Sequence, residues 1–397
     1  MNTRKESQTN AQSAQAFNRD LALIFLSNGL GSFGDGLYSY ILPVHMAKTL
    51  GTTSTEIGIL YAIVNLFAAS SLLISGFLAD RYDPKIVMIL GWSLWVPAPL
   101  IFASATNLVQ MMFGMIFWGF WFGGPSVTSY ILRSASKNTV TFALTLVSAG
   151  WSLGYIVSPA LGGYLASIAG MQLVFFSASA LYATAGLVLC FITGQRPTEN
   201  VSNDLEHRYS FLQLVREKRM LRISALFASI MFTVMMCRPF IARFLVDMYD
   251  YDSVRIGVLG SALFLGASLL GVILGKIGDR GRKPRALATA LALCGFSLVI
   301  LLFSGNFVIL AFALFFTGCS YTLWSLMNAI IGPLGPESSK ASWVSIPQSV
   351  SMFGAVVAPF VGGLLYDISP RYPFILATGA FLIISWIVRG KLLENID

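Results

Sequence analysis

The sequence predicts an all-α polytopic membrane protein with twelve transmembrane helices in two six-helix halves. Of its 397 residues, 56% are hydrophobic and 11% are charged, whereas soluble domains carry about 25% charged residues. Apolar runs of about 20 residues recur along nearly the whole chain, and this is the length of a helix that crosses a bilayer. A short charged turn between two such runs occurs twice, which indicates an internal duplication.

The boundaries of the predicted parts follow from where the apolar runs stop. The polar composition of residues 1–18 predicts a disordered cytosolic tail, and residues 391–397 are expected to form a cytosolic C-terminal tail. The charged stretch 195–220 predicts a cytosolic linker between an N-terminal half, 19–194, and a C-terminal half, 221–390. The predicted spans are 21–46, 55–78, 86–105, 107–132, 140–168, 172–194, 221–247, 254–277, 286–304, 306–333, 341–367 and 370–390.

The duplication can be followed through several stretches of the chain. The charged turn Gly76–Lys85 follows the second predicted helix, and Gly275–Lys283 follows the eighth, 199 residues later. Matches at nearly the same offset indicate two parallel six-helix halves, an arrangement that transporters use with a site between the halves. The further matches pair Ile57-Gly58 with Ile256-Gly257, Gly119 with Gly318, and Ser158–Gly163 with Ala358–Gly363.

The basic residues predict how the chain is oriented in the membrane. With the N-terminus inside, only Lys48, Arg243, Arg255 and Arg371 of the 26 Lys and Arg residues lie outside, and Arg238 lies within a helix. Both termini of this multi-pass protein are therefore expected in the cytosol, below a plasma or inner membrane. The net charge of +8 is then explained by topology and by contact with anionic lipid, so no nucleic-acid partner is expected.

Two motifs resemble a known family. The paired Gly-x-x-x-Asp-Arg turns resemble the signature loop of the major facilitator superfamily, and Gly154-x-x-x-Ser158-Pro159-x-x-Gly162-Gly163 resembles a motif of its antiporters. The resemblance covers all twelve helices. It implies a secondary transporter, usually monomeric, that binds a small molecule in a central cavity between its halves. Within the superfamily it points to the drug/proton antiporter-like branch.

The chain also departs from the family pattern at several positions. The first turn has Asp83-Pro84 where Gly-Arg is usual, and Ser158 stands at a position that is usually Gly. Met115 occupies the place in helix four where many drug/proton antiporters carry an Arg. This last departure weakens the expectation of a drug antiporter specifically.

Asp35 is the sharpest candidate for chemistry, because it lies near the midpoint of the first predicted helix. A charged side chain at mid-bilayer costs roughly 2.5–3.5 kcal/mol on insertion scales, and such residues usually face a polar cavity. Burial disfavours the charged carboxylate, so Asp35 is predicted to take up and release the coupling proton. The alternative is a carboxyl group held by neighbouring hydroxyls or an Arg and needed only for folding.

Arg238 is the expected counterpart in the seventh helix, which is the duplicate of the first. We expect its guanidinium either to pair with Asp35 or to bind an anionic group of the substrate. The alternative is an Arg that extends to the outer membrane interface.

A second set of candidates consists of polar and aromatic residues on the helices that surround the substrate path in the superfamily. Aromatic rings with a polar edge suit amphipathic ligands. Packing and interfacial anchoring explain any single member better, but as a group these residues suggest a cavity for apolar or aromatic substrates. The set is Asn28, Tyr38, Asn65, Trp118, Trp121, Trp151, Tyr155, Tyr321, Trp324, Asn328 and Gln348.

The charged turns are expected to act as gates that hold one conformation, and they also anchor topology. Pro159 and Pro359, each followed by two glycines, are expected bending points of their helices. The gate residues are Gly76, Asp80, Arg81 and Lys85 in the first turn and Gly275, Asp279, Arg280, Arg282 and Lys283 in the second.

Other chemistries are not supported by the sequence. Gly29–Gly34 matches Gly-x-Gly-x-x-Gly but lies within a membrane helix with no strand before it, so no nucleotide cofactor is expected. The cysteines lack metal-ligand spacing, and no pattern of nucleophile and base indicates an enzyme. The predicted function is proton-coupled efflux of hydrophobic or amphipathic compounds. The alternatives are a proton-linked symporter of a small organic anion and, less favoured, a membrane sensor without transport.

Overall fold

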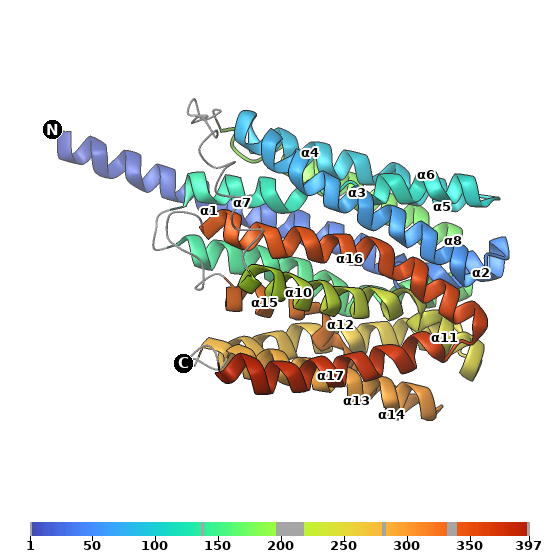
Figure 1. Cartoon of the computed structure of the whole chain (residues 1–397). Helices are drawn as coiled ribbons and strands as arrows, with labels where there is room; N and C mark the ends of the chain where they lie inside the picture. The colour runs from blue at the N-terminus through green and yellow to red at the C-terminus, as the bar shows by residue number, and fades with distance from the viewer. Residues whose placement is uncertain (1, 136–138, 196–217, 280–282, 332–339, 395–397) are drawn as a thin grey trace. The chain divides into compact units, whose positions relative to one another are not determined.

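The computed structural model describes residues 2–135, 139–195, 218–279, 283–331 and 340–394, and these form helices joined by turns (Figure 1). Most of the predicted linker, and Arg280 and Arg282 of the second charged turn, lie outside the described residues. The all-α fold class is confirmed.

The helices of the first half cover the first six predicted spans. The bounds are α1 (Asn2–Tyr38), α2 (Leu42–Leu50), α3 (Ser54–Arg81), α4 (Pro84–Trp95), α5 (Pro97–Ser104), α6 (Leu108–Gly119), α7 (Gly123–Ser134) and α8 (Val140–Leu189). The helices of the second half cover the other six. They are α10 (Lys218–Cys237), η1 (Arg238–Phe240), α11 (Ile241–Tyr249), α12 (Ser253–Ile277), α13 (Lys283–Phe303), α14 (Phe307–Thr317), η3 (Gly318–Tyr321), α15 (Leu323–Ile331), α16 (Lys340–Ile368) and α17 (Tyr372–Glu394).

Backbone breaks fall where the local sequence requires them. The predicted third helix divides before Pro97 and the seventh at Pro239, because proline removes a backbone donor. α8 contains both the fifth and the sixth predicted helices, which meet at Gly170 with φ 79° and ψ 168°, a conformation that only glycine adopts readily. α8 and α16 continue as helices through the predicted bending points Pro159 and Pro359.

By length and composition, nine segments of the described chain qualify as membrane spans. α8 counts once for two predicted helices. The first predicted helix is not among the nine, because Asn28 and Asp35 lower its hydropathy, and the fourth is absent because a break after Gly119 leaves two pieces of 12 residues each. The twelve predicted spans are therefore consistent with the structure.

The first helix begins earlier than the sequence suggested. α1 starts at Asn2 and includes most of the stretch 1–18 that was assigned to a disordered tail. Residues 2–16 contain neither proline nor glycine, and Ala and Gln, which are good helix formers, make up six of these fifteen residues.

The chain divides into two compact units whose boundary differs from the sequence halves. Unit 1 contains Met1–Ser39 and Phe67–Val201, and unit 2 contains Tyr40–Leu66 and Ser202–Asp397. The first part of α3 therefore packs with the C-terminal helices, although its sequence belongs to the N-terminal half.

The duplication is also visible in one close helix contact of each unit. A Cβ atom at Gly162 of α8 would lie 1.8 Å from the carbonyl oxygen of Leu37 in α1, and one at Gly362 of α16 would lie 2.0 Å from that of Met236 in α10. The pairs are related by the same offset as the sequence repeats. The same backbone approach therefore occurs in both units, at glycines that let helices touch.

A polar network in unit 1 joins α1, α7 and the segment that follows α8. The buried Asp20 carboxylate accepts hydrogen bonds from the Tyr130 hydroxyl at 2.9 Å and the Thr193 amide at 3.1 Å, and it pairs with Arg19 at 3.0 Å. Burial opposes ionisation of Asp20, but these hydrogen bonds together outweigh it and hold its pKa below the ordinary value.

Replacing Gly162 or Gly362 with Ala should destabilise the protein by about 1–3 kcal/mol, because the added methyl group must push two backbones apart. Thermal unfolding in detergent measures the effect. Gly379→Ala is the matched control, since a Cβ atom there meets nothing within 4 Å. Equal melting temperatures for all three variants would contradict the close-packing interpretation.

The lowered pKa of Asp20 predicts a pH dependence of stability. Its ionised form stabilises the fold fully above the ordinary Asp pKa of about 3.9, and this contribution disappears as the pH falls through the lower folded-state pKa. The difference in melting temperature between the parent and Asp20→Asn should therefore shrink below about pH 4. A difference that stays constant from pH 7 to pH 3 would rule this contribution out.

Candidate functional site

Asp35 lies in α1 with its side chain buried, and both carboxylate oxygens accept hydrogen bonds. Oδ1 accepts from the indole N–H of Trp118 in α6 at 2.7 Å and from the Tyr182 hydroxyl in α8 at 2.9 Å. Oδ2 accepts from the Tyr155 hydroxyl, also in α8. Tyr155 and Tyr182 stand on opposite sides of the Gly170 kink, so one carboxylate connects α1 to α6 and to both arms of α8.

The protonation state of Asp35 determines how well this arrangement is satisfied. An ionised carboxylate accepts hydrogen bonds at both oxygens, whereas a protonated one must use an oxygen as a donor. All three partners donate to it, so protonation makes at least one of these bonds reverse or weaken: a tyrosine hydroxyl can turn to accept, whereas the indole N–H of Trp118 can only donate. The same partners also fit the structural alternative, in which hydroxyl groups hold Asp35 for folding alone.

Aromatic rings enclose the Asp35 cluster within unit 1. Tyr38 packs on Trp118 with ring centroids 5.7 Å apart, and its hydroxyl lies 3.0 Å from that of Tyr182. Trp92 stacks on Tyr182 at 5.8 Å and on Trp151 at 6.3 Å. These rings exclude water from the carboxylate, which strengthens the hydrogen bonds that it accepts.

Arg238 lies in η1 of unit 2, partly buried, with partners from one neighbouring segment. Its Nη2 donates to the carbonyl oxygen of Ser320 at 3.3 Å and lies 3.5 Å from the Ser320 hydroxyl. The guanidinium carbon lies 3.9 Å from the centroid of the Tyr321 ring, a close cation–π contact. Its Nε is buried without a hydrogen-bond partner.

Tyr40 is a residue of the same region that the sequence did not single out. It belongs to unit 2, and its hydroxyl interacts electrostatically with that of Tyr321. The hydroxyl of Tyr40 is buried and has no hydrogen-bond partner. The ring of Tyr321 thus contacts Arg238 directly, and its hydroxyl is within electrostatic range of the Tyr40 hydroxyl. The only sequence signal was a second tyrosine two positions after Tyr38.

The remaining polar and aromatic candidates do not form one cluster with Asp35 or Arg238 in their units. In unit 2, Asn65 donates to the carbonyl of Ala355 at 2.8 Å, and Gln348 donates to Asn328 at 3.0 Å. These bonds join neighbouring helices. Asn28 in α1 and Trp324 in α15 are half-buried, and Trp121 lies 37% exposed between α6 and α7.

The first charged turn holds together the ends of several unit 1 helices. Asp83 caps α4 by accepting a hydrogen bond from the backbone N–H of Lys85. It also accepts one from the backbone N–H of Gln195 at 3.0 Å. The Lys85 ammonium donates to the carbonyls of Cys190 and Ile192, both at 2.7 Å. Asp83-Pro84, a departure from the family pattern, therefore serves as a helix start with Pro at its first position.

The other gate candidates are more exposed or less fully described. Arg81 is exposed, with its guanidinium 5.9 Å from the Phe77 ring, and Asp279 is exposed after α12. Lys283 begins α13. Gly76 and Gly275 have open space where a side chain would lie, and Asp80 lies in α3.

A cap at the start of α3 was missed by the sequence reasoning. The Asp367 carboxylate of α16 accepts from the amides of Ser54 and Thr55, both at 2.8 Å, and from the Thr55 hydroxyl at 2.6 Å. Thr53 and Glu56 form a reciprocal capping box around the same turn. The sequence Thr53–Glu56 itself is the signal for the capping box. Asp367 lies 312 residues after Thr55, so no local pattern indicates that it caps the same turn.

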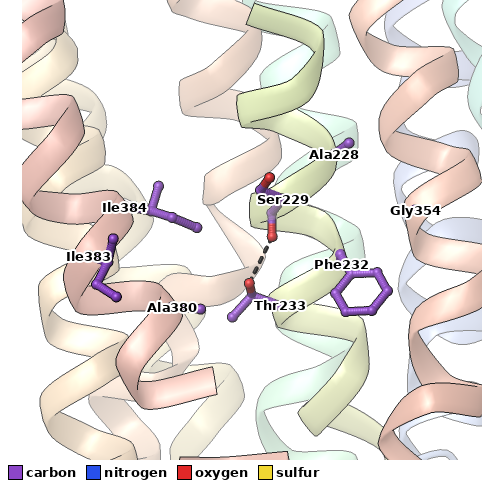
Figure 2. A pocket seen from close by; sticks show the side chains of 8 residues that line it. All are labelled: Ala228, Ser229, Phe232, Thr233, Gly354, Ala380, Ile383 and Ile384. Atoms are coloured by element: carbon purple, nitrogen blue, oxygen red, sulfur yellow. Dashed lines mark hydrogen bonds between the residues drawn. The ribbon is translucent and has the colours of Figure 1, made fainter. Parts of the chain in front are cut away.

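An apolar groove of about 470 Å³ lies on unit 2 between α10, α16 and α17 (Figure 2). Thr233 and Ser229 provide its hydroxyls, and Thr233 donates to the Ser229 carbonyl at 2.7 Å. At the equivalent place in unit 1, Gly34 and Leu181 are in contact, whereas unit 2 has Thr233 and Ala380 there. The smaller side chain at 380 leaves the space open. The residues that line the groove are Ala228, Ser229, Phe232, Thr233, Gly354, Ala380, Ile383 and Ile384.

Tyr182→Phe should lower the free energy of unfolding by about 1–3 kcal/mol, because it removes a buried donor to a carboxylate. In an Asp35→Asn background the same substitution should cost less, since the charge that the hydroxyl serves is gone. Thermal unfolding of the four proteins measures the coupling. Tyr164→Phe is the control, because Tyr164 is 52% exposed on α8. An equal cost in both backgrounds would disprove the coupling.

The fold matches solved transporter structures along nearly the whole chain. A mutant of the nucleoside transporter NupG aligns with a TM-score of 0.80 over 93% of this chain and 99% of that chain, at 14% identity. A bacterial homologue of the human lysosomal transporter Spinster, in an inward-facing and occupied conformation, aligns with a TM-score of 0.71 over 94% of both chains, at 14% identity. At these identities the likeness concerns the fold.

Sequence relatives cover the chain to a similar extent. Multidrug resistance protein 2 of Bacillus subtilis is 25% identical over 382 residues, which is 90% of this chain and 92% of the relative. Quinolone resistance protein NorA of Staphylococcus aureus is 22% identical over 374 residues, 92% and 94% of the two chains. The family model of the Major Facilitator Superfamily matches residues 24–257 and 224–394. Together with the helical fold, this match shows that the chain is a multi-pass membrane transporter that belongs to the major facilitator superfamily.

Proposed function

We propose that this protein exports hydrophobic or amphipathic organic compounds by alternating access, driven by an inward flow of protons through Asp35. The relatives named for multidrug and quinolone resistance support the substrate class and the direction. The single observation that carries the coupling role is the buried Asp35 carboxylate, which accepts hydrogen bonds from Trp118, Tyr155 and Tyr182.

The proposed coupling step follows from the hydrogen-bond chemistry of a carboxyl group. In the ionised state Asp35 connects α1 to α6 and to both arms of α8. A proton that enters the site turns one acceptor oxygen into a donor, so one of the bonds to Trp118, Tyr155 or Tyr182 must reverse or weaken. The relative stability of two helix arrangements then depends on the proton, which is what coupling requires.

Other parts of the proposal rest on the charge pattern and on the family. The termini lie in the cytosol and the protein works as a monomer in a plasma membrane. The charged turns at Gly76–Lys85 and Gly275–Lys283 act as gates, and the helices bend near Pro159 and Pro359. The contacts of Lys85 with the end of α8 support a rigid first turn.

A second candidate function is a proton-linked symporter that imports a small organic anion. The unsatisfied guanidinium of Arg238 favours it. The pH-gradient direction that drives accumulation separates the two functions, because an antiporter and a symporter use opposite directions.

Flux in proteoliposomes with an imposed pH gradient tests the proposal. Lipophilic cations and small organic anions are offered to the parent, to Asp35→Asn and to a control, Asp250→Asn. Asp250 is exposed with φ 52°, a conformation that Asn also tolerates. Gradient-driven flux should be lost in Asp35→Asn, with substrate counterflow retained, and kept in the control.

If Asp35→Asn still follows the gradient, the proton site lies elsewhere. His45 in α2 would then be the next residue to test; its Nδ1 lies 3.1 Å from the Thr49 hydroxyl.

A further inference from the structure

We propose that Arg238 and Tyr40 form a subsite for an organic anion, so that the transported compounds include ones with a carboxylate on an aromatic body. Both residues belong to unit 2. The inference rests on the proposed function only in taking the ligand to be a transported compound.

Arg238 carries a charge without a countercharge among its contacts. Its hydrogen bonds go to the carbonyl and hydroxyl of Ser320, at 3.3 and 3.5 Å. These are long contacts to neutral groups. In the described chain, the ion pairs join Arg19 to Asp20 and Arg243 to Asp247 instead. A cation inside a membrane protein is expensive unless an anion or carbonyl groups compensate it.

Asp35, the acid that the sequence suggested as a partner of Arg238, has its hydrogen bonds within unit 1. Both oxygens of Asp35 already accept hydrogen bonds from unit 1 donors, namely Trp118 and Tyr182 at Oδ1 and Tyr155 at Oδ2. The carboxylate of Asp35 is therefore satisfied without Arg238. The guanidinium remains available to a different anion.

The geometry of the Arg238 guanidinium favours a carboxylate ligand. Tyr321 covers its face, with the guanidinium carbon 3.9 Å from the ring centroid. A ring on the face leaves the N–H groups at the edge, and Nε is buried without a partner. The planar edge of Arg matches a carboxylate with two parallel hydrogen bonds.

Tyr40 provides a second buried donor that has no hydrogen-bond partner. The Tyr40 hydroxyl is buried and unpartnered, and it interacts electrostatically with Tyr321. A buried hydroxyl without a partner costs free energy in the empty site. A carboxylate that accepts from both Arg238 and Tyr40 would satisfy the two groups together, whereas a cationic ligand would satisfy neither.

The aromatic surroundings indicate the body of the ligand. Tyr321 packs on Phe264 with centroids 5.1 Å apart, so the subsite adjoins a cluster of rings. Such rings suit an aromatic ligand. The anion is therefore expected to be attached to an apolar, planar molecule and not to be a free inorganic ion.

The test compares the binding of one rhodamine dye that carries a free carboxylate with the binding of its methyl ester. The purified protein is placed in nanodiscs of phosphatidylcholine at about pH 7.5, where a carboxylic acid with an ordinary pKa of about 4 is ionised. The parent should bind the acid more tightly than the ester. Arg238→Gln should weaken acid binding about 10- to 100-fold and change ester binding little.

Further variants keep the test informative if Arg238→Gln folds poorly. Arg238→Lys should retain part of the preference, because an ammonium group lacks the planar fork. Tyr40→Phe should weaken acid binding about 3- to 10-fold and leave ester binding unchanged. Arg243→Gln is the matched control, since Arg243 already pairs with Asp247 at 3.3 Å, and it should keep the full preference.

Several outcomes would overturn the inference. In the first, the parent binds the acid and the ester equally well, or binds neither compound. In the second, Arg238→Gln weakens the binding of the acid and of the ester to the same extent. Competition by added phosphatidylglycerol would assign the subsite to a lipid headgroup instead of a substrate. Flux of the ester under a pH gradient tests the proposed export separately, so that function can stand if the anion subsite fails.

Discussion

The chemistry of unit 1 depends on one constraint, which is that a buried carboxylate must have hydrogen-bond donors. A carboxylate moved into apolar surroundings without partners loses far more free energy than a folded protein has to spare. Asp35 therefore requires donors from α6 and α8, and those donors are large aromatic residues that must themselves be packed. Trp92 and Trp151 provide that packing. The aromatic residues around Asp35 are therefore needed to hold this one acid away from water.

The duplication repeats the backbone but not the chemistry. Gly162 and Gly362 bring equivalent helices together at equivalent carbonyls. At the position of Asp35, however, the second copy has Val234, and at the position of Arg238 the first copy has Ser39. One unit therefore holds an acid and the other a base on a common scaffold.

The sequence was sufficient for the features that composition and local patterns determine. The apolar runs predicted the helices, and the family model confirms the superfamily that the paired turns suggested. Asp35 and Arg238 stood out because a charge in an apolar run is conspicuous. Their partners could not be predicted, because Trp118, Tyr155 and Tyr182 are ordinary residues for a membrane helix, and only the packing of α1 against α6 and α8 makes them donors. Tyr40 was missed for the same reason, and the roles of all these residues stay predictions.

The cap on α3 has a consequence for how the chain assembles. The amides of Ser54 and Thr55 find their acceptor on Asp367, which is made 312 residues later. Until α16 has been synthesised and inserted, the first turn of α3 must keep these amides bonded to water or lipid headgroups. The N-terminal half therefore cannot finish folding during its own synthesis. The ribosome must synthesise nearly the entire chain before α3 reaches its final contacts.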